Sequence, residues 1–457
     1  MIRSFLVFTM LMIAINLSAQ SQSLLYNQYK NPQALMSNPG MRYQETDMHI
    51  GIPFLSNIQL SFTNSAFSVA DIFNDQDINQ NIDRELSELD SDDYLQFNEK
   101  IDLINIGWHK NKYYFTAGFY QESHASANYP KDLLQLIYYG NSSVNRTYDL
   151  DGLAGSLNAQ GVFHFGINKA VNKKLYIGGR FKVYSSTFNA HTRNNKGTFL
   201  SQTTDQPAVL EQRIQNLDVY LKSAGFDQNS QGDETDFNPS DLFTGDNFGA
   251  GIDFGFSYQV SRRTEITGSI IDLGFIAFSS NTKNLRLNGS YNFEGVELIF
   301  PDFDQGDSII DYYEELRAEI DEEITDETTT SSYIYAQPTK LNLGWSYRFG
   351  GIEACDCPID QDRIEGNQEI GAHFFAANYP GSVRHFLNFY YQRSFWDRFN
   401  IRLISGVAQL ERFNFGLGVS ARFKGYSFFL NADTLRYADN FYFAKDIAVQ
   451  GGMSIML

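Results

Sequence analysis

The C-terminal segment constrains the fold of this chain more than any other. Its last residues alternate in polarity, with Ile447, Val449, Met453, Ile455 and Leu457 on one face. A period of two indicates a β-strand with one apolar face. In a transmembrane β-barrel such a last strand pairs with the first strand, so the sheet has no open edge. The end of the chain therefore predicts a closed barrel.

Several interior segments repeat this alternation. Between Phe248 and Tyr258, apolar side chains alternate with Gly, Asp, Ser and Gln, and segments 175–183, 341–349 and 413–423 follow the same period. Each segment has one apolar face and one face of small, polar or charged residues. A strand with these two faces suits a wall between lipid and an aqueous lumen. We therefore place the apolar face outward.

The expected fold is all-β, a transmembrane antiparallel β-barrel of about 14 strands with short helices in outer loops or in a plug. An even strand number places both ends of the chain in the periplasm, with short periplasmic turns and longer outer loops. Segment 351–366 becomes one long periplasmic turn, and 214–221 and 291–300 are candidate extra strands in outer loops. The expected strands are 44–67, 99–109, 112–127, 155–169, 174–191, 247–260, 263–280, 333–349, 367–378, 383–395, 398–410, 412–423, 425–435 and 445–457.

The N-terminal residues carry the pattern of a secretory signal. Arg3 precedes an apolar run from Phe5 to Leu17, and Ser18-Ala19 forms a small-residue cleavage site. We expect three parts: a signal peptide at 1–19 that is removed, an N-terminal periplasmic or plug segment at 20–43, and an outer-membrane β-barrel at 44–457. The expected location is the bacterial outer membrane.

Composition agrees with this class. Aromatic residues make up 15% of the chain, and no other segment approaches the ~20 apolar residues of a spanning helix. The net charge of −19 argues against a nucleic-acid partner. The acidic residues concentrate in segments 71–93, 302–327 and 353–365, which we interpret as solvated loops. The expected partners are membrane lipid and, for some roles, other outer-membrane or periplasmic proteins.

Three loop segments have the spacing of short helices. Apolar residues recur at helical intervals over 78–89 and 309–324, and segment 129–137 begins with a Tyr-Pro pair and carries an apolar cluster. The third segment is either a plug or lid helix or a helix that packs over the rim. The pattern does not choose between these two interpretations.

The sequence contains no recognisable catalytic motif, so we expect no enzyme, no cofactor and no metal. His124 and His191 lie near acidic loops, but a hydrogen-bonded histidine in the lumen or rim explains them better than catalysis. The alternating acidic and amide residues from Asp75 to Asp83 imitate a calcium loop but lack its central glycine. Cys355 and Cys357 are too close in sequence for a disulfide framework, and a local disulfide in a turn is the expected state.

Charged residues on the small-residue face are the candidate functional residues. They could form a ring that selects anions in a pore. They could equally cross-link a lumen filled by the N-terminal segment, which a barrel of this size can hold. We favour the structural role. The candidates are Arg180, Lys182, Asp253, Arg348 and Arg422.

A few passages resemble a known family. They include Asn38-Pro39-Gly40, the segment from Ile50 to Asn57, Tyr129-Pro130-Lys131-Asp132, and the segment from Pro338 to Gly344. Together they resemble a Bacteroidota family of exported barrels of unknown function, distantly similar to PorP/SprF proteins of type IX secretion and to FadL-type transporters. The resemblance spans nearly the whole mature chain. It implies an outer-membrane barrel and assigns no functional residue.

Two functions follow as expectations. The first is a non-enzymatic accessory or scaffold component of an outer-membrane secretion, assembly or surface complex, because the outer loops are large and acidic. The alternative is a FadL-like channel or transporter for a small, possibly hydrophobic, molecule. Partner pull-down would support the first function, and conductance in a planar bilayer would support the second.

Overall fold

The computed structural model describes most of the chain. The described residues are 22–43, 46–140, 144–203, 210–225, 243–293, 323–351, 366–379, 382–396, 398–407, 414–433, 437 and 439–457. The expected signal peptide, the cysteine turn and nearly all of the expected helix at 309–324 lie outside them. Among the described residues, no helix has both the length and the apolarity needed to cross a membrane.

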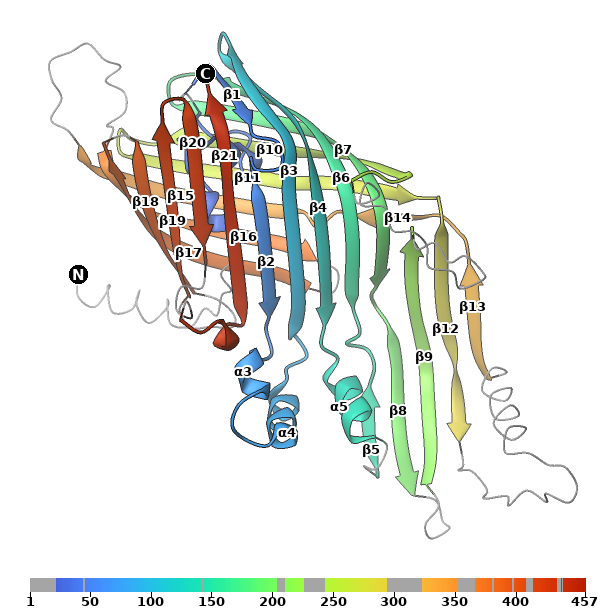
Figure 1. Ribbon diagram of the computed structural model, residues 1–457. Helices are drawn as coiled ribbons and strands as arrows, with labels where there is room; N and C mark the ends of the chain where they lie inside the picture. Colours follow the sequence, from blue (N-terminus) through green and yellow to red (C-terminus); the bar gives the residue numbers. More distant parts are fainter. Residues whose placement is uncertain are drawn as a thin grey trace, which may run out of the picture.

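The wall is a closed antiparallel barrel of 14 strands, which confirms the expected fold (Figure 1). The first wall strand is interrupted: β1 (Met48–Gly51) and β2 (Ile58–Asn64) both pair with β3 (Tyr94–Lys110) and with β21 (Asp446–Met456). This pairing of the first and last strands closes the sheet. The other wall strands are β4 (Tyr113–Asn128), β6 (Gly155–Ala170), β7 (Leu175–Thr192), β10 (Asn247–Gln259), β11 (Thr264–Phe278), β14 (Tyr333–Ala336) continued by β15 (Lys340–Gly351), β16 (Gly366–Tyr379), β17 (Ser382–Phe395), β18 (Phe399–Val407), β19 (Asn414–Phe423) and β20 (Tyr426–Ala432).

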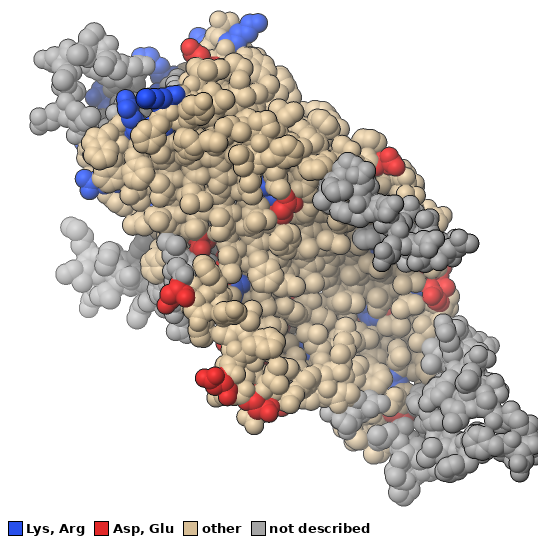
Figure 2. All heavy atoms as spheres, viewed as in Figure 1, with Lys and Arg blue, Asp and Glu red and all other residues tan. Residues whose placement is uncertain are grey.

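The two faces of the wall differ as the alternation predicts. On β10, Phe254 is 53% exposed on the outside, whereas the adjacent Asp253 is 0% exposed inside. On β15, Leu343 and Trp345 are exposed and Asn342 is buried. In the space-filling view, charged atoms are sparse on the visible wall and gather towards its two ends (Figure 2). The exposed apolar face is therefore the outside of the barrel.

A β-bulge interrupts the alternation in the lumen. The register between β10 and β11 shifts so that Ile271 and Asp272 together oppose Asp253. Asp272 has a left-handed backbone with a φ of 61° and donates its backbone N–H to Asp253 Oδ1 at 2.8 Å. A bulge of this kind bends the strand and redirects a side chain. As a result both carboxylates point into the lumen, although strict alternation would put Asp272 outside.

Short helices lie at one end of the barrel, which we call the loop end (Figure 1). They are α3 (Val69–Ile72), α4 (Ile78–Glu88) and α5 (Lys131–Tyr139). The side chain of Asp77 caps α4 by accepting backbone N–H donors, so the acidic run near Asp75 begins a helix and not a calcium loop. Lys131 on α5 donates to the Leu89 carbonyl after α4 at 2.7 Å. The helix expected near 129–137 thus packs over the rim and does not enter the lumen.

At the loop end the same sheet continues beyond the barrel as an extension along its axis, here called the loop-end sheet (Figure 1). Its strands pair in the order β5, β8, β9, β12, β13, and β9 also pairs with the end of β7. Segment 214–221 lies within β9, and segment 291–300 is described only at its first residues, at the end of β12. The bounds are β5 (Arg146–Asp149), β8 (Lys196–Thr203), β9 (Leu210–Ala224), β12 (Thr282–Phe293) and β13 (Ile324–Thr329).

The N-terminal segment 22–43, here called the plug, lies inside the barrel. It contains the short helices α2 (Gln22–Leu25) and η1 (Pro32–Met36) and has no strand. Leu24, Tyr26 and Ala34 are almost fully buried in it. The sequence left open whether this segment hangs in the periplasm or folds inward, and the structure places it in the lumen.

Candidate functional site: the lumen and its plug

Wall side chains hold the plug through its backbone carbonyls. Arg180 on β7 donates from Nη2 to the Leu35 carbonyl at 2.5 Å and from Nη1 to the Met36 carbonyl at 3.2 Å. Asn168 on β6 donates to the carbonyls of Pro39 and Met41 at 2.6 and 2.9 Å. Bonds from a charged donor are about twice as strong as neutral ones. The guanidinium of Arg180 is therefore a major anchor of the plug.

Arg402 on β18 provides a second arginine anchor. Its guanidinium donates to the carbonyls of Leu24 and Tyr26, and its Nε donates to Gln392 Oε1 at 2.9 Å. It also lies over the Tyr390 ring. The sequence analysis did not select Arg402, although its alternation with Ile401 and Leu403 places it on the inward face.

Two wall glycines allow the plug to lie directly against the backbone of the wall. A Cβ added at Gly178 would lie 2.0 Å from the Pro39 carbonyl oxygen, and one at Gly255 would lie 2.1 Å from Asn38 Oδ1. Conversely, a Cβ at Gly40 would meet the Gly255 carbonyl oxygen at 2.1 Å. Real side-chain carbons do not approach this closely. The Asn-Pro-Gly passage and these glycines thus form one close backbone contact.

The plug also has an apolar side. Leu25, Ala34, Leu35, Met41 and Tyr43 form a buried cluster with three wall residues. The wall residues of this cluster lie towards the end of the barrel where the chain enters β1 and leaves β21. We call this end of the barrel the turn end. The three are Tyr114, Phe429 and Met456. Polar anchors and a small apolar core therefore close the lumen together.

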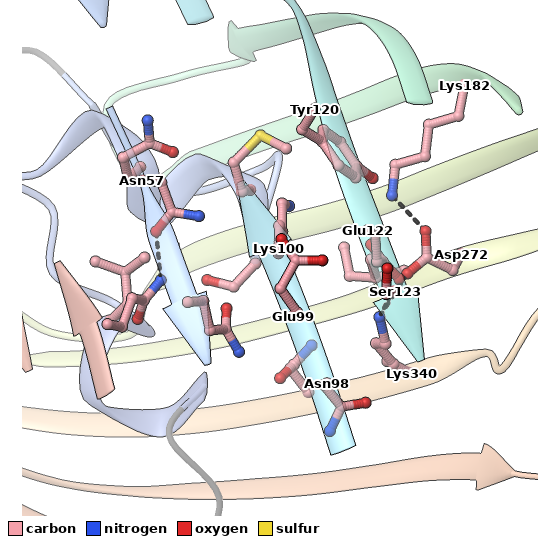
Figure 3. Close-up of a pocket in the computed structure, with 18 residues that line it drawn as sticks. Asn57, Asn98, Glu99, Lys100, Tyr120, Glu122, Ser123, Lys182, Asp272 and Lys340 are labelled. Carbon is pink, nitrogen blue, oxygen red and sulfur yellow. Dashed lines mark hydrogen bonds and ion pairs between the residues drawn. The ribbon is translucent and has the colours of Figure 1, made fainter. Parts of the chain in front are cut away.

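A buried charge network lies next to the plug. Asp253 Oδ2 accepts Arg180 Nη1 and Lys182 Nζ, both at 2.9 Å. Lys182 Nζ also lies 2.5 Å from Asp272 Oδ1, and Lys340 Nζ lies 2.9 Å from Asp272 Oδ2 (Figure 3). Three cations thus share two carboxylates. A buried ion network of this kind specifies a geometry more than it adds stability, because desolvation opposes the Coulomb attraction.

The five candidate residues from the sequence all face the lumen but form three separate groups. Arg180, Lys182 and Asp253 lie together in the network above. Arg348 instead lies 2.7 Å from a carboxylate oxygen on each of two other wall strands, and its guanidinium lies over the Tyr29 ring of the plug. Arg422 donates to the Lys30 carbonyl of the plug at 3.4 Å. The partners of Arg348 are Glu265 and Glu369.

Sequence reasoning missed several lumen residues. Asp272 was hidden by the bulge, whose only local signal is the apolar doublet Ile270-Ile271 that breaks the alternation. Lys340 immediately precedes a segment that was recognised, and Lys100 and Glu122 lie on strands without a clean apolar period. Inward charges on irregular strands cannot be assigned to a face without the register.

A polar cavity lies between the plug and the loop end. Its volume is about 80 Å³, which is enough to hold several water molecules. Figure 3 shows charged and amide side chains from β2, β3 and β4 around it. Leu25, Gln33, Met36 and Ser37 of the plug contribute to its lining. The wall residues of the lining are Asn57, Gln59, Asn98, Glu99, Lys100, Tyr120, Glu122, Ser123, Lys182, Ile271, Asp272, Lys340, Asn342 and Gln450.

A second, smaller cavity shares part of this lining and continues past His124 and Tyr379. His124 Nδ1 lies 2.8 Å from Asn98 Oδ1, and its ring stacks on Tyr379. His191 Nδ1 lies 3.0 Å from Asn189 Oδ1. Both histidines therefore sit in hydrogen-bonded lumen positions. Within the described ranges, no group of three or more His, Cys, Asp or Glu residues could hold a metal ion.

Known barrels match this chain with low similarity. The Ralstonia pickettii toluene transporter TbuX is 14% identical, with a TM-score of 0.40 over 93% of this chain and 92% of that chain. A deltaS2S3 mutant of the TodX monoaromatic hydrocarbon channel of Pseudomonas putida is 9% identical, with a TM-score of 0.45 over 93% of both chains. A Pseudomonas aeruginosa FadL homologue is 8% identical, with a TM-score of 0.36 over 96% of this chain and 98% of that chain. These values are too low to support an inference from those proteins to this chain.

None of the curated proteins compared with the chain matches it. A family model does match, over residues 39–433, and it is described as a family of unknown function (DUF5723). The match begins within the Asn-Pro-Gly passage of the plug and covers nearly all of the wall. The chain therefore belongs to this family.

Proposed function

We propose that this protein is a bacterial outer-membrane channel for small polar solutes, held closed by its own N-terminal plug. The observation that carries the proposal is a closed wall around a polar cavity, with a plug that is attached by hydrogen bonds to its backbone. The plug is part of the chain but not part of the sheet. It can therefore move without breaking any strand pairing of the wall.

Placement in the outer membrane is supported by the wall and by the N-terminal pattern. Apolar side chains cover the outside of a sheet that has no open edge, which is the arrangement that lipid requires of a spanning β-structure. The signal-peptide pattern at 1–19 supports export. In this placement the turn end faces the periplasm and the loop end faces outward.

The chemistry of the lumen favours polar over hydrophobic cargo. The cavity is lined largely by amide, hydroxyl and charged groups, with few apolar side chains. A hydrophobic molecule there would remove these groups from water without replacing their hydrogen bonds. This differs from the FadL-like alternative as it was expected from the sequence, in which the solute could be hydrophobic.

Planar-bilayer conductance of the mature full-length chain tests the channel. We expect a mostly closed state with rare openings, because the plug occupies the lumen. Arg402→Met should increase the open fraction, since it removes the donor to the carbonyls of Leu24 and Tyr26. Arg384→Met is the matched control: Arg384 is a buried lumen arginine that lies over Tyr94 and Tyr379 and has no plug contact among those the structure gives for it. If neither wild type nor Arg402→Met conducts, the channel proposal is wrong.

A scaffold role is the second candidate, and the projecting sheet at the loop end supports it. That sheet and helices α3 to α5 provide a folded surface beyond the wall (Figure 1). Purification from native membranes in mild detergent should then recover a stoichiometric partner. Deletion of the β8–β9 hairpin should release this partner while the wall remains folded. A chain recovered without any partner would argue against the scaffold role.

A further inference from the structure

Two oppositely charged groups of the cavity lining lie side by side next to the buried network. Lys100 on β3 and Glu122 on β4 are directly opposite in the strand register, and both line the cavity (Figure 3). Opposite residues on one face of an antiparallel pair have Cβ atoms only about 4.5–5.5 Å apart, so a Lys and a Glu there commonly pair. Here they form no ion pair within 4.0 Å among the described side chains.

Lys100 contacts an aromatic ring and interacts electrostatically with the buried Asp102, whereas Glu122 has one long ion pair. The ammonium group of Lys100 lies 3.8 Å from the centroid of the Tyr120 ring. The Glu122 carboxylate is 3.7 Å from Lys340 Nζ, beyond hydrogen-bond distance, and its side chain is 20% exposed to the cavity. Lys340 itself is bound at 2.9 Å to Asp272. Lys100 thus forms no ion pair within 4.0 Å among the described side chains, and the long ion pair of Glu122 leaves its carboxylate able to accept a closer donor.

We infer that this cavity binds a small zwitterion of the α-amino-acid class. The ligand carboxylate would pair with Lys100 and the ligand ammonium with Glu122. Amide side chains such as Gln33, Asn98 and Asn342 can donate to and accept from the remainder of the ligand. The volume of the cavity limits the ligand to a few heavy atoms beyond these two groups.

Other small ligands fit the charges less well. A simple anion would pair with Lys100 but also face the carboxylates of Glu99, Glu122 and Asp272. A simple cation would meet Glu122 but also three lysine ammonium groups. A neutral sugar would bring no opposite charge to either Lys100 or Glu122. Discrimination by such unpaired or like charges is a common source of specificity.

The inference deepens the channel proposal and rests on it for access, because the ligand reaches the cavity through the lumen. Binding itself can be measured separately by isothermal titration calorimetry on the mature full-length chain in detergent. The probes are L-alanine, propionate, ethylammonium and glucose. We expect saturable binding of L-alanine at least tenfold tighter than that of the other three.

Two variants test the assigned contacts. Lys100→Met and Glu122→Gln should each weaken L-alanine binding at least tenfold, and Arg384→Met should leave it unchanged. Circular dichroism of each variant checks the fold. If one of the two variants does not fold, the other still tests the site.

Three outcomes would overturn the site: no saturable L-alanine binding, equal binding of propionate, or wild-type affinity in both Lys100→Met and Glu122→Gln. If the wild-type chain conducts in bilayers but does not bind L-alanine, the site is rejected and the channel proposal stands. If the wild-type chain binds L-alanine but never conducts, the channel proposal is rejected and the site stands.

Discussion

The contribution of Arg180 to closure of the lumen can be worked out from its contacts. The guanidinium donates two hydrogen bonds to plug carbonyls, at 2.5 and 3.2 Å, and one to Asp253 at 2.9 Å. In Arg180→Met, Asp253 keeps Lys182 at 2.9 Å and the Asp272 backbone N–H at 2.8 Å. The loss therefore falls mainly on the two bonds to the plug.

A hydrogen bond to a charged group contributes about 1.5–3 kcal/mol. Two such bonds at the lower end of this range amount to about 3 kcal/mol. Since about 1.4 kcal/mol corresponds to a tenfold change in an equilibrium constant, displacement of the plug should become about a hundredfold more frequent. The wall should remain folded, because none of its strand pairings involves this side chain.

Single-channel recording in planar bilayers measures this displacement as an open fraction. Arg180→Met should raise the open fraction by about two orders of magnitude, and Arg384→Met should stay within a few-fold of wild type. Both substitutions remove one buried lumen arginine, so the comparison isolates contact with the plug. An equal rise in both variants, or no rise in Arg180→Met, would refute the anchoring argument.

Three further predictions concern the plug contact, the lipid-facing wall and the loop-end sheet. Gly178→Ala should destabilise the seated plug by about 1–3 kcal/mol through overpacking. Gly179→Ala should not, because its added Cβ would lie 3.6 Å from the nearest atom, the Asp253 carbonyl oxygen. Proteolysis of the N-terminal segment compares the two variants, and equal cleavage rates would contradict the close contact. If Phe254 faces acyl chains, Phe254→Arg should lower the free energy of unfolding in lipid vesicles by about 2–4 kcal/mol. Urea-induced unfolding measures this change, and an unchanged midpoint would show that Phe254 does not face lipid. Hydrogen bonds from Arg286 lower the pKa of Asp218 in the loop-end sheet, so this pair stabilises the sheet above the ordinary aspartate pKa and the effect is lost as pH falls through the lowered value. Arg286→Ala should raise that pKa in a carboxyl ¹³C NMR titration, and an unshifted titration would contradict the pairing.

The wall could be predicted in detail because its signal is local. Each expected strand overlaps an observed one, including the first strand, expected over 44–67, and the last strand, expected over 445–457. The helix expected over 78–89 appears as α4. In a barrel, the side chain on every second residue meets lipid, and this constraint is visible in any window of a few residues.

The candidate site was only partly predictable because its contacts are not local. The sequence placed Arg180, Lys182 and Asp253 on the inward face but could not show that they share one network. It did not place Asp272 there, because the bulge that turns this carboxylate inward exists only in the pairing of β10 with β11. The position of Lys100 directly opposite Glu122 became visible only with the strand register.

By itself, then, the sequence determined the closed all-β wall, its number of strands and the separation of an apolar outside from a polar inside. Period-two alternation encodes these features in each strand independently. The tertiary structure alone decided that segment 22–43 enters the lumen, which arginines hold it, and which charges meet beside the cavity. These features depend on contacts between residues far apart in the chain, such as Arg180 with Leu35, 145 positions away, and no short window of sequence contains both partners.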